Sequence, residues 1–232
     1  MRVKCANQRM QYTMSMSTRA NKLSRGTRRL SRRGDTRKLL IDTALSMLDG
    51  DKSFDGLSLR ELTREVGIVP TGFYRHFPDM DALGLALVEE SFRSLRQILE
   101  DVRKDTRSAE RLVASVVQSL YRHIAANRPG FAFIASERFG GSATVRNAIR
   151  RELRLVQTEL AVDLARLPYL KEWNTPDLHM IASLIVNAMV AIAVDVLDVG
   201  AHDQEGETAL MKRAEQQLRL ILLGVPHWKS RR

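Results

Sequence analysis

The segment Ser58-Leu-Arg-Glu-Leu-Thr-Arg-Glu-Val-Gly-Ile-Val-Pro-Thr-Gly-Phe-Tyr-Arg-His-Phe77 has the pattern of two short helices joined by a tight turn. Ser58 can cap the first helix, and Glu61 three residues later completes a capping box. Gly67 supplies the left-handed residue that ends this helix. Pro70 suits the first turn of the second helix, where its missing N–H is not needed.

Helical spacing separates a buried face from an exposed face in both helices. Leu59, Leu62 and Val66 recur at this spacing and predict the buried face of the first helix. Phe73 and Phe77 lie four residues apart and predict the buried side of the second helix. The outward side chains of the second helix can all donate hydrogen bonds, and they are Thr71, Tyr74, Arg75 and His76. We therefore predict a helix-turn-helix whose exposed face suits a DNA major groove.

The residue types on this face favour particular DNA contacts. Arg75 is the best candidate for reading a base, because a guanidinium can bind guanine O6 and N7 as a fork. Thr71 is suited to a thymine methyl or a phosphate, and Tyr74 and His76 are suited to phosphates. The alternative is an ordinary solvated polar face. The full set of predicted DNA-contacting residues is Arg32, Arg33, Ser58, Arg60, Pro70, Thr71, Gly72, Tyr74, Arg75 and His76.

The net charge of the chain resides at its N-terminus. The chain has 37 Lys and Arg against 27 Asp and Glu, a formal net charge of +10, and no acidic residue precedes Asp35. Such a basic, Ser/Thr-rich segment cannot bury enough apolar surface to fold alone. We expect residues 1–34 to form a flexible arm along DNA phosphates. The alternative is a solubilising or wrongly assigned start, because Met10, Met14 and Met16 are possible initiators.

Composition favours a cytoplasmic protein, and the family resemblance described below implies a bacterial protein associated with the nucleoid. Cys5 is the only cysteine, which excludes an internal disulfide and fits a reducing compartment. The longest apolar run, from Met180 to Val194, is short for the roughly 20 residues that a bilayer needs. We expect this run to be a buried helix, with no membrane partner. The Arg-rich start also resembles an organelle transit peptide, which is a further alternative.

Helical periodicity dominates the remainder of the chain, without sustained strand alternation. We predict an all-α protein with a DNA-binding domain at 35–78 and a helical ligand-binding and dimerisation domain at 79–232. A long helix from Asp79 toward Lys104 joins the two. Five more helices are predicted between ordinary stop signals, at 109–126, 129–136, 142–167, 175–198 and 207–223.

A three-helix DNA-binding unit, a helix with Phe73-Tyr-Arg-His-Phe77 and an all-helical remainder together resemble the TetR family of repressors. This motif resemblance covers Asp35 to about Glu90. A wider resemblance, over most of Asp35 to Lys229, is to the FabR/DesT-type branch that controls unsaturated fatty acid synthesis. Besides the Phe73–Phe77 segment, it is carried by Leu57-Ser-Leu-Arg-Glu61, Val69-Pro-Thr71, Leu83-Gly-Leu85, Glu137-Arg-Phe-Gly-Gly-Ser142 and His227-Trp-Lys229.

The resemblance implies an all-α homodimer that binds a palindromic operator on double-stranded DNA. It also implies a repressor of fatty acid desaturation or unsaturated fatty acid synthesis genes, without a cofactor. Its effector would be a long-chain acyl-CoA or acyl-carrier-protein thioester. Two departures bear on operator preference. Gly72 stands where a side chain able to touch DNA is usual, and Val69 offers no capping acceptor to the second helix.

The C-terminal half carries apolar clusters of the kind that an acyl chain needs for a dry tunnel. The alternative is that these residues simply fill the core. Arg138, beside Gly140-Gly141, is a candidate for holding a pantetheine or nucleotide phosphate, together with Arg146, Arg150, Arg151 and Arg154. An exposed helix face is the alternative for these arginines. The predicted ligand-binding set is Phe92, Phe131, Phe133, Ile134, Arg138, Phe139, Ile181, Leu184, Ile185 and Met189.

The last two long helices are expected to form the homodimer by packing on their counterparts into a four-helix bundle. His179, Asn187 and Asp195 interrupt the apolar helix at intervals of eight and are expected at this interface, or alternatively at a ligand headgroup. Two recognition helices must then lie about 34–36 Å apart to enter successive major grooves. The expected apolar contact residues are Val190, Val194, Leu197, Leu210, Leu218 and Leu222.

Other classes of function fit this sequence less well. It contains no Gly-x-Ser-x-Gly, no His-Glu-x-x-His and no Walker-type Gly-Lys, so no catalytic or metal-ligating set is predicted. A protein that coats DNA through its basic arm alone would not need a recognition helix. The main alternative is a TetR-type repressor that controls efflux or catabolic genes and responds to a different small hydrophobic ligand, such as a drug-like cation.

Deleting residues 1–31 is expected to lower the slope of log affinity against log salt, because each lost phosphate contact removes about 0.9 from that slope. Operator binding measured at several salt concentrations between about 50 and 200 mM checks this expectation. An unchanged slope would show that the arm makes no phosphate contacts.

Overall fold

The computed structural model describes residues 34–48, 52–103, 109–199 and 203–230. Every regular element within these ranges is helical, which confirms the predicted all-α fold. A first helix spans residues 34–47. The elements that follow are η1 (Phe54–Gly56), α2 (Leu59–Val66), α3 (Pro70–Phe73), α4 (Met80–Arg103), α5 (Ala109–Ala126), α6 (Arg128–Glu137), α7 (Ala143–Leu164), α8 (Thr175–Asp198), α9 (Gln204–Leu223) and η2 (Val225–His227).

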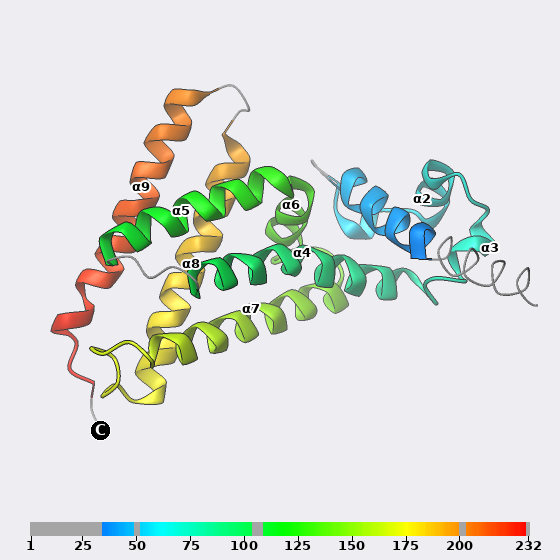
Figure 1. Cartoon of the computed structure of the whole chain (residues 1–232). Coiled ribbons are helices and arrows are strands. Elements are labelled where there is room, and N and C mark those ends of the chain that lie inside the picture. Colours follow the sequence, from blue (N-terminus) through cyan, green and yellow to red (C-terminus); the bar gives the residue numbers. More distant parts are fainter. Residues whose placement is uncertain (1–33, 49–51, 104–108, 200–202, 231–232) are drawn as a thin grey trace, which may run out of the picture.

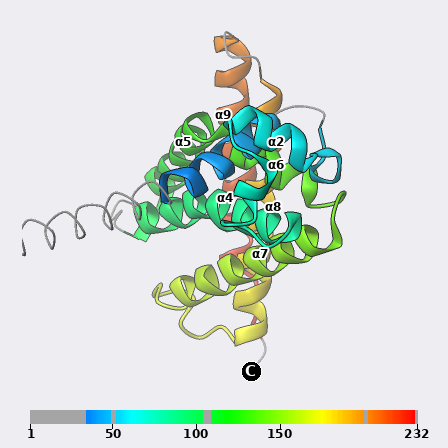
Figure 2. The ribbon, with the colours of Figure 1, turned by 90° about the vertical axis from the view of Figure 1, so that its right-hand side faces the viewer.

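The DNA-binding unit lies at one end of the molecule and consists of the first helix, η1, α2 and α3 (Figure 1). The remaining long helices form the body, and α4 runs into this body from beside the DNA-binding unit. α7 packs along α4 and against α8, and α9 packs against α8 and α5. Seen from the end of the molecule, the DNA-binding unit lies in front of the bundle (Figure 2).

Side-chain caps set several helix starts. Asp79 Oδ1 accepts a hydrogen bond from Ala82 N at 2.7 Å, and Asn174 Oδ1 accepts one from Asp177 N at 2.8 Å. α5 and α8 have the predicted bounds. α9 begins earlier than predicted, at Gln204, because Asp203 caps it through a 2.8 Å bond from Gly206 N. Such caps satisfy backbone donors that a helix start otherwise leaves without partners.

Tyr121 ties α5 to the first turn of α9. Burial and a hydrogen bond to Glu207, whose negative charge acts in the same direction, raise the pKa of Tyr121. The phenol therefore stays neutral over the physiological range and keeps its proton for this bond.

One apolar cluster is shared by the DNA-binding unit and the body. Its buried members include Leu62 and Phe73 in the DNA-binding unit, and Ile134 and Val190 in the body. A second cluster fills the space among α4, α5, α8 and α9, and a third joins the end of α7 to the start of α8. The two units are therefore packed on each other and not merely tethered.

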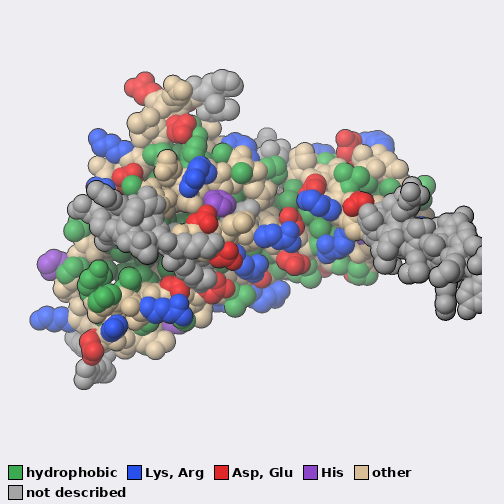
Figure 3. Space-filling view, viewed as in Figure 1, with side chains coloured by type: hydrophobic (Ala, Val, Ile, Leu, Met, Phe, Trp, Pro, Cys, Tyr) green, Lys and Arg blue, Asp and Glu red, His purple; other side chains and the backbone are tan. Residues whose placement is uncertain are grey.

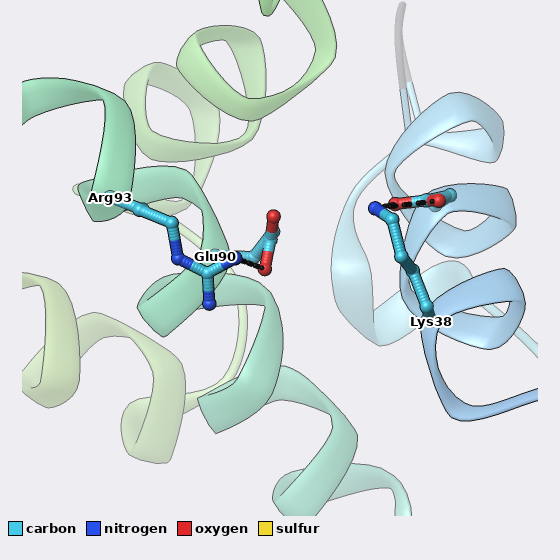
Figure 4. Close-up of polar contacts among 4 residues, drawn as sticks. Lys38, Glu90 and Arg93 are labelled. Atoms are coloured by element: carbon cyan, nitrogen blue, oxygen red, sulfur yellow. Dashed lines mark hydrogen bonds and ion pairs between the residues drawn. The ribbon is translucent and has the colours of Figure 1, made fainter. Parts of the chain in front are cut away.

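Charged side chains mark the surface. Acidic and basic groups are interspersed over the visible face of the body (Figure 3), in keeping with the balanced charge of the chain after residue 34. Two ion pairs shown in Figure 4, Lys38–Asp42 at 3.0 Å and Arg93–Glu90 at 2.8 Å, each lie within one helix. Such exposed pairs contribute only about 0.3–0.5 kcal/mol each.

α8 is apolar on nearly every side. By length and composition alone it would qualify as a membrane-spanning helix, a test that core helices of soluble proteins also meet. Only 33% of its most apolar window is buried within the chain. The prediction of a buried helix is therefore wrong for one side of α8, where Met180, Leu184 and Val194 are exposed.

Candidate DNA-binding face and effector cavity

The helix-turn-helix forms as its local signals predict. Ser58 Oγ accepts a hydrogen bond from Glu61 N at 3.1 Å and caps α2. Gly67 ends the helix with φ 75°, a left-handed conformation that disfavours residues with a Cβ. The predicted capping box also requires the Glu61 carboxylate to accept a hydrogen bond from Ser58 N, and this bond is absent among the described residues. The Glu61 carboxylate lies 3.8 Å from Lys52 Nζ. Leu62 is fully buried, so α2 is anchored by its apolar face.

The recognition segment is shorter as a regular helix than expected. α3 ends at Phe73, and Tyr74, Arg75 and His76 follow in a turn, although Phe77 N still donates to Phe73 O at 3.1 Å. Val69 gives α3 no side-chain cap. Gly72 costs roughly 1 kcal/mol relative to alanine in a helix, so both departures noted in the sequence weaken α3.

The predicted faces of this segment are confirmed. Phe73 and Phe77 are buried with their ring centroids 5.6 Å apart, and Tyr74 is exposed and meets Phe73 edge-on. Among the predicted DNA contacts, Gly72 and His76 are half-buried, and Arg32 and Arg33 lie outside the described residues. The others are exposed on the same unit, and they are Ser58, Arg60, Pro70, Thr71, Tyr74 and Arg75.

Arg37, in the first helix, is a further cation beside the recognition segment. Its guanidinium carbon lies 5.0 Å from the centroid of the Phe77 ring. Its charge is thereby placed next to the exposed polar face. Arg37 was not predicted as a DNA contact, because nothing local in the sequence connects position 37 to the end of α3.

An apolar cavity of about 40 Å³ lies where α4, α6, α7 and α8 meet. Each lining side chain is hydrocarbon or thioether, without a charged or hydroxyl group. Such a surface favours hydrocarbon and excludes an unpaired charge. The lining residues are Leu95, Ile98, Phe131, Ile134, Ala135, Leu153, Val156, Val186, Met189, Val190 and Ala193.

Only three of the ten predicted ligand-binding residues line this cavity, namely Phe131, Ile134 and Met189. Phe92 and Phe133 are completely buried in the core shared with the DNA-binding unit. Ile181 belongs to the third apolar cluster, and Ile185 packs between the second and third.

Leu184, Phe139 and Arg138 lie elsewhere on the surface. Leu184 is 51% exposed, so the expectation that it faces inward is wrong within the chain. Phe139 is 77% exposed and carries the Arg138 guanidinium 4.8 Å above its ring. Both residues follow the last turn of α6, away from the cavity lining.

The cluster of arginines after Arg138 divides by role. Arg146 donates to the carbonyl oxygens of Gly140 and Gly141 at 3.1 and 3.0 Å and so holds the α6–α7 turn. Arg150, Arg151 and Arg154 are exposed on α7. Within the described part of the chain, no group of three or more His, Cys, Asp or Glu side chains is arranged to hold a metal.

The expected dimer contacts mostly face the core of the chain. Val190, Leu210 and Leu218 are buried, and Leu197 and Leu222 pack against the second cluster. These positions were misplaced because helical spacing alone does not say which apolar side is covered by the same chain. Of the six predicted contact residues, only Val194 is exposed within the chain. The other large apolar residues that the last two long helices expose are Met180 and Leu184 on α8 and Leu220 and Leu223 on α9.

His179, Asn187 and Asp195, which interrupt the apolar sequence of α8, do not share one environment. Asn187 is exposed and donates to Ser183 Oγ at 3.3 Å, whereas Asp195 accepts from Arg213 on α9 at 2.6 Å. His179 is half-buried.

Family models match both parts of the chain. Residues 40–87 match the model for bacterial regulatory proteins of the tetR family, and residues 108–224 match the tetracyclin repressor-like C-terminal domain. The chain therefore belongs to the TetR family and is a DNA-binding transcriptional regulator, not an enzyme.

Solved structures agree with this fold. The regulator FadR from Bacillus subtilis in complex with stearoyl-CoA matches with a TM-score of 0.63 and 15% identity, over 81% of this chain and 98% of its own. The fatty acid degradation regulator FadR from Bacillus halodurans matches with a TM-score of 0.62 and 15% identity, over 79% and 94%. A putative transcriptional regulator from Pseudomonas aeruginosa PAO1 matches with a TM-score of 0.63 and 15% identity, over 83% and 93%. At 15% identity, these three matches show a shared fold only.

Arg75→Ala is expected to relax operator specificity, because it removes a candidate for base recognition. The free energy of operator binding should weaken by about 1–3 kcal/mol. Tyr74→Phe is the matched variant, since it keeps the ring on Phe73 and removes only the hydroxyl. It should weaken binding to all sequences with little change in preference. Gel shifts with operator and scrambled DNA measure both effects, and unchanged operator affinity in both variants would contradict the assigned face.

Proposed function

We propose that this regulator is a repressor of fatty acid desaturation or unsaturated fatty acid synthesis genes, with operator affinity set by a long-chain acyl-CoA or acyl-carrier-protein thioester. The observation that carries this proposal is the wholly apolar cavity among α4, α6, α7 and α8. The stearoyl-CoA complex of the similar Bacillus subtilis regulator adds support for an acyl ligand in this fold.

The cavity chemistry suits an acyl chain, and its size implies movement. A space of about 40 Å³ is far below the roughly 300–1,000 Å³ of ordinary ligand pockets. A long chain would therefore enter only if the four surrounding helices separate. Close-packed cores resist such expansion, so occupancy would be transmitted to neighbouring elements.

The DNA-binding role rests on the exposed polar face of α2 and the recognition segment. In this proposal Arg75 reads a base, Thr71 contacts a thymine methyl or a phosphate, and Tyr74 and His76 fix the register on phosphates. Arg37 joins them as a phosphate contact, because its stacking on Phe77 places its charge at this face.

The operator-binding form is proposed to be a homodimer through α8 and α9. Met180, Leu184 and Val194 expose apolar surface on α8, and Leu220 and Leu223 do so on α9, at 73% and 66% exposure. Apolar surface of this kind on neighbouring long helices favours burial against a second copy. The partner would also cover the side of α8 that gives this helix its membrane-like composition.

Adding palmitoyl-CoA and oleoyl-CoA is expected to shift operator affinity in opposite directions, by about 5- to 150-fold. The measurement is operator binding by the purified protein, with DNA upstream of its own gene and of neighbouring genes. Coenzyme A without an acyl chain is the control and should leave affinity unchanged, because it offers nothing to an apolar cavity. The same acyl chains on acyl carrier protein distinguish the two thioester carriers. If DNA binding is specific but no thioester alters it, the protein is still a DNA-binding regulator, and its effector is a different small hydrophobic ligand.

Leu184→Glu is expected to convert the dimer into monomers, because it places a charge on the proposed interface. Leu155→Glu on α7 is the matched control, since Leu155 is 52% exposed and Leu184 is 51% exposed. Light scattering after size-exclusion chromatography gives the oligomeric state. Equal behaviour of the two variants would place the interface elsewhere.

A further inference from the structure

A buried carboxylate joins the body to the DNA-binding unit. Glu137, the last residue of α6, is 1% exposed, and its Oε1 accepts a hydrogen bond from Phe54 N at 2.7 Å. Phe54 begins η1, the turn that leads into α2. The bond therefore spans 83 residues of sequence and ends directly before the helix-turn-helix.

The ring of Phe54 sits in a socket built by three helices of the body. It meets Phe133 of α6 edge-on, with the ring centroids 6.3 Å apart. Gly84 of α4 allows this fit, because a Cβ there would lie 2.8 Å from Phe54 Cζ and 2.6 Å from Val145 Cγ2 of α7. The socket and the hydrogen bond thus hold the same residue.

The Glu137 carboxylate fits against the α6–α7 turn only because position 141 is a glycine. Gly141 has φ 61°, and a Cβ on it would lie 1.7 Å from Glu137 Oε2. The carboxylate therefore occupies the space that any other residue at position 141 would fill. Arg146 binds the carbonyl of Gly141 and keeps this turn in place.

The same short helix borders the effector cavity. Phe131, Ile134 and Ala135 of α6 line the cavity, whereas Phe133 and Glu137 of α6 contact Phe54. α6 has ten residues, so its two faces move together as one rigid piece. Displacement of its cavity face must therefore strain the contacts of its other face.

Only one of the two carboxylate oxygens of Glu137 has a hydrogen-bond partner among the described residues. Glu137 Oε2 is buried without a hydrogen-bond partner among the described residues. A buried carboxylate with a single donor offsets little of its lost hydration. Movement that opens the site would return this oxygen to water, so the closed contact is poised to open.

We propose that Glu137 is a latch, a positioning residue that couples the effector cavity to operator binding through Phe54. With the latch closed, η1 and α2 are held on the body in the geometry described here. Filling the cavity displaces α6, pulls Glu137 from the Phe54 amide and frees the DNA-binding unit to reorient. The latch rests on the proposed effector cavity and not on the identity of the ligand.

The test fills the cavity by mutation, so it needs no ligand. Ala193→Phe inserts a ring from α8, opposite α6, and overpacking of this kind displaces neighbouring elements. Amide hydrogen exchange should become faster at Phe54, and operator affinity should change by about 5- to 150-fold. Glu137→Leu removes the latch, and in that background Ala193→Phe should alter operator affinity less than twofold.

A glycine pair supplies the matched control. Gly141→Ala should reproduce Glu137→Leu, because it expels the carboxylate while leaving Glu137 in the sequence. Gly140→Ala should behave as the unmodified protein, because a Cβ there meets only Ser136 O, at 3.6 Å. Glu137→Gln keeps an acceptor for the Phe54 amide and should retain most of the coupling, which separates the bond from the charge.

Two results would overturn the latch. One is unchanged exchange at Phe54 in Ala193→Phe, which is measured in a chain with the latch intact and holds even if the Glu137 variants fold poorly. The other is independent effects of Ala193→Phe and Glu137→Leu on operator affinity, as expected for a residue with a merely structural role. Acyl thioesters play no part in these measurements, so a wrong effector and a wrong latch give different results.

Discussion

The packing of Phe54 against the body is the constraint on which the arrangement of this protein depends. The DNA-binding helices amount to about 45 residues, a size at which a domain is marginal with its own core alone. Their buried side chains join one cluster that continues into α4, α6, α7 and α8. The DNA-binding unit is thus stabilised by the part of the protein that contains the apolar cavity.

This shared core gives a physical basis for regulation. A transcriptional regulator that responds to a ligand needs two arrangements of its DNA-binding unit that differ by only a few kcal/mol, so that the ligand can select between them. Here α6 carries cavity residues on one side and the contacts of Phe54 on the other. Because α6 is a rigid helix of only ten residues, it can connect the cavity to Phe54 directly, without an extended network of side-chain contacts.

α8 shows how one helix can serve several surfaces at once. Val186 and Met189 border the cavity, Ile192 and Val196 fill the second cluster, and Leu184 remains exposed. An apolar sequence on every side is the natural result, and it also explains the resemblance of α8 to a membrane span. The proposed dimer would bury the side that the chain itself leaves exposed.

Local signals in the sequence determined the helices, since caps, left-handed glycines and helical spacing act over a few residues. Ser58, Gly67 and Pro70 therefore predicted α2 and the turn, and α5 and α8 were placed at their observed ends. The sequence also indicated which side of the recognition segment is buried, because Phe73 and Phe77 lie four residues apart and so share one side of a helix. Tertiary structure decided which of many similar apolar residues border a cavity, because a cavity is the space left between four helices distant in sequence. It likewise decided that Leu184 faces outward and that Glu137 reaches Phe54, because the partner of a side chain 83 residues away depends on packing and not on spacing.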